Sequence, residues 1–223
     1  MSKTRLMTAV TIGVAGVLLT GCGSAAPGVA AKVGDQVLTV RDVDSVTSHY
    51  CESVADQLES PVAMTFVRQY VVQLLALRLQ ADQVADDYGV KAGSGYRNDV
   101  AQRQGTAGAM PEEVRADYIK LTSTPAYAQD IVDQVGAAVL DERGVSDPTS
   151  EQVTEAGLDV FNQWPDANGV EIDPRYGLRS VDGVLTPVDT NTSVAVGDTA
   201  KAGLEERPDP SFAKSLPTTH RCG

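Results

Sequence analysis

The 223-residue sequence predicts a mainly α-helical fold: five or six helices, a small N-terminal hairpin, a short closing strand and an irregular C-terminal tail. Apolar residues recur every three or four positions through most of residues 40–164, which is the period of an amphipathic helix. Alternation typical of a strand occurs over residues 33–39 and 170–172, and only briefly at residues 194–196. After residue 177 the chain is rich in Pro, Gly, Ser, Thr and Asp, which predicts mostly irregular structure.

The N-terminus has the pattern of an export signal. Lys3 and Arg5 precede an uncharged apolar run over residues 6–19, which is shorter than the roughly 20 residues that a membrane-spanning helix needs. The run ends in Leu-Thr-Gly-Cys, which resembles the bacterial lipobox. We therefore expect residues 1–21 to be a lipoprotein signal peptide and Cys22 to be the lipid-attachment site. An uncleaved anchor or an ordinary secretory cleavage are the alternatives.

This pattern also predicts the domain organisation and the location of the protein. Residues 22–30 are small and mostly uncharged, which is typical of a flexible tether. Residues 31–177 form the expected helical domain, and residues 178–223 form the tail. Two or more acyl chains on one residue hold a protein stably on a membrane. The expected location is the extracytoplasmic face of the bacterial cell membrane.

The expected domain opens with a hairpin that leads into a helix. Gly34 and Asp35 separate two short alternating segments, as in a tight hairpin turn. Thr39 and Asp42 have the spacing of a capping box, which starts a helix. The apolar positions that follow predict a helix that ends near Glu59.

The second predicted helix is the longest element. Ser60 has the residue type of an N-cap, and Pro61 follows at the first helical position. Apolar residues then cover more than half of the circumference until Gly89 closes the helix. Such a helix must be surrounded by other elements, so we expect it to be the spine of the core.

Residues 91–110 are polar and rich in glycine, and they predict only a short helix over residues 98–104. Pro111 is expected at the first position of the next helix, followed by two carboxylates, Glu112 and Glu113, near the positive end of its dipole.

Two further helices and a strand complete the expected domain. Thr124 and Pro125 predict the start of one helix, and the capping-box spacing of Thr149 and Gln152 predicts the start of the next. Pro165 is expected to end this last helix, because proline cannot donate a backbone hydrogen bond. Residues 170–172 predict a strand that can pair with the N-terminal hairpin.

The cysteine count predicts one disulfide. If Cys22 carries lipid, Cys51 and Cys222 remain, and two cysteines in an oxidising compartment make one bridge. Such a bridge ties the tail to the first helix. Closing so long a loop stabilises by about 4–5 kcal/mol in the chain-entropy model. Two free thiols or an intermolecular bridge are the alternatives.

The sequence shows no catalytic or metal-binding constellation. His49 and His220 lack a second ligand at metal spacing, and His49 is most simply a solvated side chain. On a helix, His49 and Cys51 point about 200° apart, so they cannot act as a nucleophile pair. The adjacent acids at residues 86–87 and 112–113 predict solvated faces. We therefore expect no enzymatic activity and no cofactor.

The charge balance excludes nucleic acid as a partner. The chain has 18 basic and 30 acidic residues, a net charge of −12. Lys3 and Arg5 leave with the signal peptide, so the mature chain has a net charge of about −14. Binding to phosphate backbones needs basic patches, whereas an acidic balance keeps an exported protein soluble.

Three segments together resemble the N-terminal chaperone domain of SurA-type proteins. Residues 31–42 (AKVGDQVLTVRD) are similar to the hairpin and helix start of that family, although Asp35 stands where glycine is commoner. Residues 72–90 (VQLLALRLQADQVADDYGV) are similar to its central helix, and residues 170–177 (VEIDPRYG) to its closing strand. The resemblance covers about residues 30–180 and implies a helical, chaperone-like domain.

One departure from this family limits the function that the resemblance implies. SurA-type foldases usually carry a parvulin prolyl-isomerase domain after this region. Here only 47 residues follow Tyr176, with one histidine and no Gly-Gly-x-Leu-Gly segment. The resemblance therefore implies a holding function without isomerase activity.

The expected function is a membrane-anchored chaperone, or holdase, that binds unfolded or partly folded secreted proteins. The alternative is an envelope lipoprotein that grips one specific folded protein partner. An enzyme that acts on envelope polymers would need a pocket of converging polar residues, which the sequence does not show.

Overall fold

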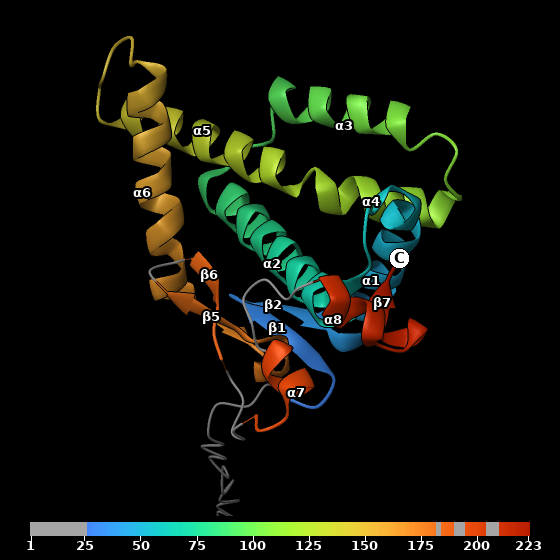
Figure 1. The fold of residues 1–223 in the computed structure, drawn as a ribbon. Coiled ribbons are helices and arrows are strands. Elements are labelled where there is room, and N and C mark those ends of the chain that lie inside the picture. Colours follow the sequence, from blue (N-terminus) through green and yellow to red (C-terminus); the bar gives the residue numbers. More distant parts are fainter. Residues whose placement is uncertain (1–25, 182–183, 190–194, 204–209) are drawn as a thin grey trace, which may run out of the picture.

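The computed structural model describes residues 26–181, 184–189, 195–203 and 210–223, and it confirms the mainly α-helical fold class (Figure 1). The α-helices are α1 (Val40–Val54), α2 (Met64–Tyr88), α3 (Ser94–Thr106), α4 (Glu112–Thr122), α5 (Thr124–Glu142), α6 (Ser150–Asn168), α7 (Asp198–Ala202) and α8 (Pro210–Ser215). The strands are β1 (Val29–Val33), β2 (Gln36–Thr39), β3 (Val62–Ala63), β4 (Val170–Ile172), β5 (Leu178–Val181), β6 (Val184–Pro187) and β7 (Arg221–Cys222). Helices α1–α6 form the body, as expected for the helical domain.

A three-stranded antiparallel sheet with the order β2-β1-β4 lies along α2, near the C-terminal end of α6 (Figure 1). The predicted hairpin is confirmed, with Gly34 in the turn at a φ of 57°. The closing strand pairs with this hairpin, with Val170 opposite Val33. Strand β1 begins at Val29, and Ala30 is fully buried, so the last two residues of the predicted tether belong to the sheet.

Both predicted capping boxes are confirmed. In α1 the Thr39 hydroxyl accepts from the Asp42 N–H, and the Asp42 carboxylate accepts from the Thr39 N–H, each at 3.2 Å. In α6, Thr149 and Gln152 exchange the same two bonds. These side chains satisfy N–H groups that the helix itself leaves unbonded. Helix α1 ends slightly earlier than predicted and continues as a 3₁₀ turn over Ala55–Gln57.

The predicted start of the second helix is wrong by three residues. Helix α2 begins at Met64 with Ala63 as its N-cap, and neither Ser60 nor Pro61 begins it. Instead, Val62 and Ala63 form β3 and pair with the C-terminal strand β7. The partner strand comes from the far end of the chain, so local capping preferences around Ser60 could not indicate this pairing.

Helix α2 is the spine of the core, as predicted. Its N-terminal half packs with β1, α1 and α4 in one apolar cluster that includes Val43, Val71 and Leu121. Its C-terminal half packs with α5 and α6 in a second cluster that includes Ile131 and Phe161. Each fully buried Leu, Val or Ile side chain contributes roughly 1.5–3 kcal/mol. The left-handed Gly89 ends the helix at the predicted position.

Pro165 does not end α6, which continues to Asn168. A proline in a helix leaves the carbonyl four residues earlier without its usual N–H donor. Here that carbonyl belongs to Phe161, and it accepts from the buried Gln80 side-chain amide at 2.7 Å. The α2 side chain therefore replaces the missing backbone bond, which explains why the helix can pass through Pro165.

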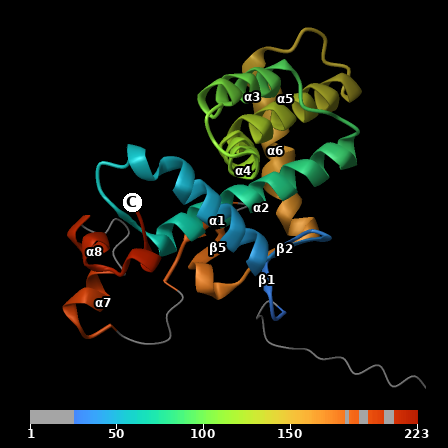
Figure 2. The ribbon, with the colours of Figure 1, turned by 90° about the vertical axis from the view of Figure 1, so that its right-hand side faces the viewer.

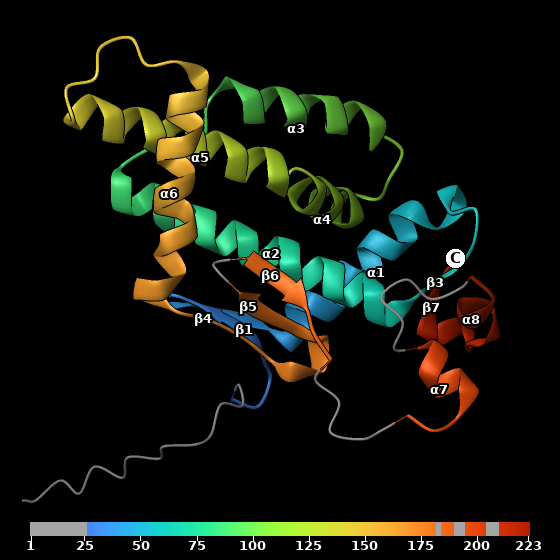
Figure 3. The same ribbon diagram turned by 60° about the vertical axis from the view of Figure 1, so that its left-hand side comes forward.

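Helix α3 is longer than the short helix expected over residues 98–104, because it spans Ser94–Thr106. It lies on the outer side of α5 and α4 (Figures 2 and 3). No residue within α3 is buried. Helix α4 begins one residue later than expected, with Pro111 as its N-cap.

The prediction of an irregular tail is wrong for part of residues 178–223. Strands β5 and β6 form a hairpin, and α7 and α8 are short helices. The hairpin region lies against α2, where Gln69 Nε2 donates to the Tyr176 and Gly177 carbonyls and Gln73 Nε2 donates to the Leu185 carbonyl. Side chains of α2 thus bond to backbone carbonyls in and just before the tail, which holds this part of the chain against the body.

Candidate functional site

The candidate site is a groove between α3 and α4, and α4 is its fixed wall. The first turn of α4 carries Glu112 and Glu113 near the positive end of the helix dipole. Val114 and Leu121 are buried toward the core. The residues at positions 112, 115, 116 and 119 follow the i, i+3, i+4, i+7 spacing and therefore share the opposite face, which lines the groove.

The second wall is formed by one face of α3. Tyr96, Val100 and Gln104 are four residues apart and line the groove together. The start of α3 is held by Asp130 of α5, whose Oδ2 atom accepts from the N–H groups of Gly93 at 2.8 Å and Tyr96 at 2.9 Å. These bonds satisfy N–H groups in the first turn of α3.

An aromatic cluster lies at the N-terminal end of this wall. The Tyr96 ring packs edge-on against Tyr127, with centroids 5.0 Å apart. The Arg78 guanidinium lies 3.5 Å from the Tyr127 ring centroid and donates to the Tyr96 hydroxyl at 3.2 Å. Burial and a hydrogen bond to Asp82 raise the pKa of Tyr127, so its phenol stays neutral. Cation–π and hydrogen-bond contacts therefore anchor the N-terminal end of α3 to α2 and α5.

The groove has a volume of about 560 Å³, which is within the size range of ligand pockets. Its lining combines apolar and polar side chains: Tyr96, Val100, Gln104, Glu112, Arg115, Ala116, Ile119 and Lys120. Between the Tyr96 anchor and the fully buried Ala107, no α3 side chain is buried. Tyr96, Asp99, Val100 and Arg103 form a half-buried face along α3, so this outer wall is less deeply packed than α4.

The side of α4 that faces away from the groove is firmly attached to α1. His49 Nδ1 lies 2.7 Å from Asp117 Oδ2, which joins the two helices. The Tyr50 and Tyr70 rings are 5.4 Å apart, and burial together with Tyr70 and Tyr118 raises the pKa of Tyr50 to about 12. His49 is therefore not the solvated side chain that the sequence predicts.

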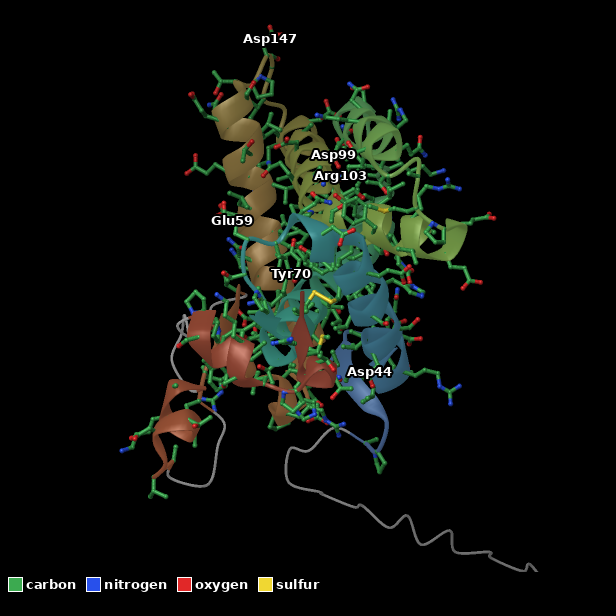
Figure 4. All side chains as sticks on the ribbon, turned by 45° about the vertical axis from the view of Figure 1, so that its right-hand side comes forward. Asp44, Glu59, Tyr70, Asp99, Arg103 and Asp147 are labelled. Carbon is green, nitrogen blue, oxygen red and sulfur yellow. A yellow bond between two sulfur atoms is a disulfide. The ribbon has the colours of Figure 1, made fainter. Side chains whose placement is uncertain are left out.

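Arg103 and Asp99 lie one helical turn apart on α3, above Tyr70 (Figure 4). Two guanidinium nitrogens of Arg103 donate to the Asp99 carboxylate at 2.7 and 3.0 Å, and this pairing raises the pKa of Arg103. The pair stabilises α3 internally, because both residues belong to the same helix.

The structure joins Cys51 of α1 and Cys222 of β7 in a disulfide, with Cα atoms 5.5 Å apart, as the cysteine count predicts (Figure 4). Cys22 lies outside the described residues, so its lipid attachment stays a prediction. His220 lies in an exposed 3₁₀ turn. Asp87 is not merely solvated, because its carboxylate accepts from the Trp164 indole N–H at 2.9 Å.

Within the described ranges, no three His, Cys, Asp or Glu side chains gather as metal ligands. Among the helices of those same ranges, none has the length and apolar character to cross a bilayer. Comparisons of the chain with protein-family models, with curated proteins and with solved structures find no match.

Sequence reasoning did not identify the groove. The available indication was the four-residue spacing of Tyr96, Val100 and Gln104 inside the segment expected to be mostly loop. Glu112 was correctly expected to be exposed, but its place at the groove depends on how α3 folds back over α4.

Proposed function

We propose that the protein is an extracytoplasmic, lipid-anchored chaperone of the SurA type that holds unfolded or partly folded exported proteins and has no catalytic activity. The observation that carries this proposal is the groove of about 560 Å³ between α3 and α4. The lipobox pattern at Cys22 supports the anchor and the location. Membrane attachment would concentrate the groove where unfolded chains leave the translocation machinery.

The lining of the groove suits an unfolded polypeptide. Val100, Ala116 and Ile119 offer apolar surface, and burial of a client's apolar side chains against it would drive binding. Tyr96 and Gln104 add hydrogen-bonding groups next to that surface. A holdase must accept different sequences, and adaptable surfaces allow the packing to vary.

The attachment of α3 supports this adaptability. Asp130 and Arg78 hold its first turn, and Ala107 is buried just after its last turn. Between these points the helix has no buried residue, so small shifts of this wall cost few contacts. The width of the groove can then adjust to client side chains, while α4 stays in place through the contact of Asp117 with His49 of α1 and through the burial of Leu121 in the core.

The proposal is tested by aggregation of a chemically denatured client, followed by light scattering, with increasing amounts of the full-length protein. Near-stoichiometric protein should suppress aggregation. The Val100→Asp/Ile119→Asp variant should lose most of this effect, because it places two carboxylates in the apolar lining. Leu158→Asp, on the exposed face of α6, is the control and should retain suppression.

Two outcomes would contradict the proposal. One is a folded wild-type protein that neither suppresses aggregation nor binds unfolded peptides. The other is a pull-down that yields one stoichiometric, folded partner, which would favour an envelope lipoprotein with a dedicated protein partner. A prolyl-isomerase assay on a short peptide should show no acceleration in either case.

A further inference from the structure

The charges that line the groove differ in sign from the charge of the chain. The chain has 30 acidic and 18 basic residues, yet the groove is lined by two cations, Arg115 and Lys120, and one anion, Glu112. Local charge at a binding surface selects partners of the opposite sign more strongly than net charge does. The groove is therefore a locally positive site in an acidic protein.

These two cations have no partner within the described part of the chain. There, Arg68, Arg78 and Arg103 each form an ion pair with an aspartate. Neither Arg115 nor Lys120 takes part in an ion pair or a side-chain hydrogen bond among those residues. Both are thus available to a ligand.

The cations also flank the apolar part of the lining. Arg115 and Lys120 are five residues apart on α4, which is about 7.5 Å along the helix axis. Ala116 and Ile119 lie between them in the sequence and line the same groove. A ligand that places an apolar side chain on Ile119 brings its neighbouring residues toward one cation or the other.

We propose that the groove prefers unfolded segments in which apolar side chains stand next to aspartate or glutamate. This inference rests on the proposed holding function and adds the chemical class of the client segment. Ion pairs at a partly exposed site contribute modestly, so two cations should change affinity by about three- to tenfold. Apolar burial supplies the affinity, and the cations supply the selection.

The test uses two fluorescent peptides with the same Leu-, Val- and Phe-containing centre, one flanked by aspartates and the other by lysines. Their dissociation constants for the full-length protein are measured by fluorescence anisotropy at 50 and 500 mM salt. The wild type should bind the aspartate-flanked peptide about fivefold more tightly at low salt, and less so at high salt.

Charge reversal with a matched control assigns this preference to the groove. Arg115→Glu/Lys120→Glu should bind the lysine-flanked peptide more tightly than the aspartate-flanked one. Lys91→Glu/Arg143→Glu changes the net charge equally at exposed positions outside the groove lining and should keep the wild-type preference. Circular dichroism checks that both variants are folded. If the charge reversal unfolds α4, Arg115→Gln/Lys120→Gln replaces it, and this neutral variant should bind both peptides equally.

The outcomes separate the two proposals. Equal binding of both peptides by the wild type, or an equal loss of preference in the control variant, would overturn the acidic preference while leaving the holding function intact. Absence of binding to either peptide would overturn the holding function and this inference together.

Discussion

Helices α5 and α6 cross in contact through glycines, whereas α3 and α4 enclose a groove. At the crossing, Gly136 of α5 lies against the backbone of Val153, and Gly157 of α6 lies against the backbone of Val132. A Cβ atom at either glycine would meet a backbone carbonyl group of the other helix. On α3, a Cβ added to Gly105 would meet nothing within 4 Å. Gly136 and Gly157 therefore allow two helices to pack closely, whereas Gly105 faces open space.

The difference separates a firm region from an adjustable one. Where backbones touch, neither helix can shift without losing contacts along its length, so α2, α5 and α6 behave as one packed unit. Helix α3 has no buried residue and turns only a half-buried face to its neighbours, so a shift of this helix loses fewer buried contacts. The candidate site therefore lies between α4, which is packed into the core, and α3, which is not.

The largest expected effect comes from a substitution at the crossing of α5 and α6. Gly136→Ala should destabilise the protein by about 3 kcal/mol or more, because the added methyl group forces two helix backbones apart. The free energy of unfolding from urea titration measures this. A loss below about 1 kcal/mol would show that the α5–α6 crossing is not close-packed.

Removing the disulfide should have the next largest effect. Cys51→Ser/Cys222→Ser should lose about 2–4 kcal/mol, because β7 is then no longer tied to α1 and its pairing with β3 loosens. Urea titration gives the stability, and hydrogen exchange gives the protection of Val62 and Ala63. Two free thiols besides Cys22 in the non-reduced wild type, counted by mass spectrometry, would contradict the bridge.

The hydrogen bond between the Gln80 side chain and the Phe161 carbonyl should contribute the third largest effect on stability. Gln80→Met should cost about 1–3 kcal/mol, because the buried Phe161 carbonyl loses its donor. In a Pro165→Ala background the same change should cost about 1 kcal/mol less, since residue 165 then supplies a backbone N–H. A double-mutant cycle by urea titration measures this coupling, and an additive result would refute the replacement of the missing bond.

The smallest effect has the opposite sign and lies in the adjustable region. Gly105→Ala should stabilise the protein by about 0.5–1 kcal/mol, because alanine favours the helix and the methyl group has space. Thermal unfolding measures the gain. A loss of stability would show that α3 is packed more tightly than its exposure indicates, and would remove the contrast with Gly136.

Local sequence patterns predicted the elements whose interactions are close in the sequence. The capping boxes at Thr39 and Thr149 and the left-handed Gly89 all act within a few residues, so they were readable directly. The predictions failed where a distant partner intervened. Val62 became a strand through Cys222, and Pro165 stayed in a helix through Gln80.

The sequence by itself determined the mainly helical class, the hairpin and several helix boundaries, and it favoured the Cys51–Cys222 pairing over free thiols or an intermolecular bridge. Hydrophobic periodicity, helix caps and residue counts can be read from the sequence without knowing which distant residues meet. Only the tertiary structure decided that α3 folds back over α4, that Arg115 and Lys120 lie on one groove without partners among the residues that the structure describes, and that an α2 side chain contacts the tail hairpin. These features depend on contacts between residues far apart in the sequence, and no local pattern encodes the distance at which two helices settle.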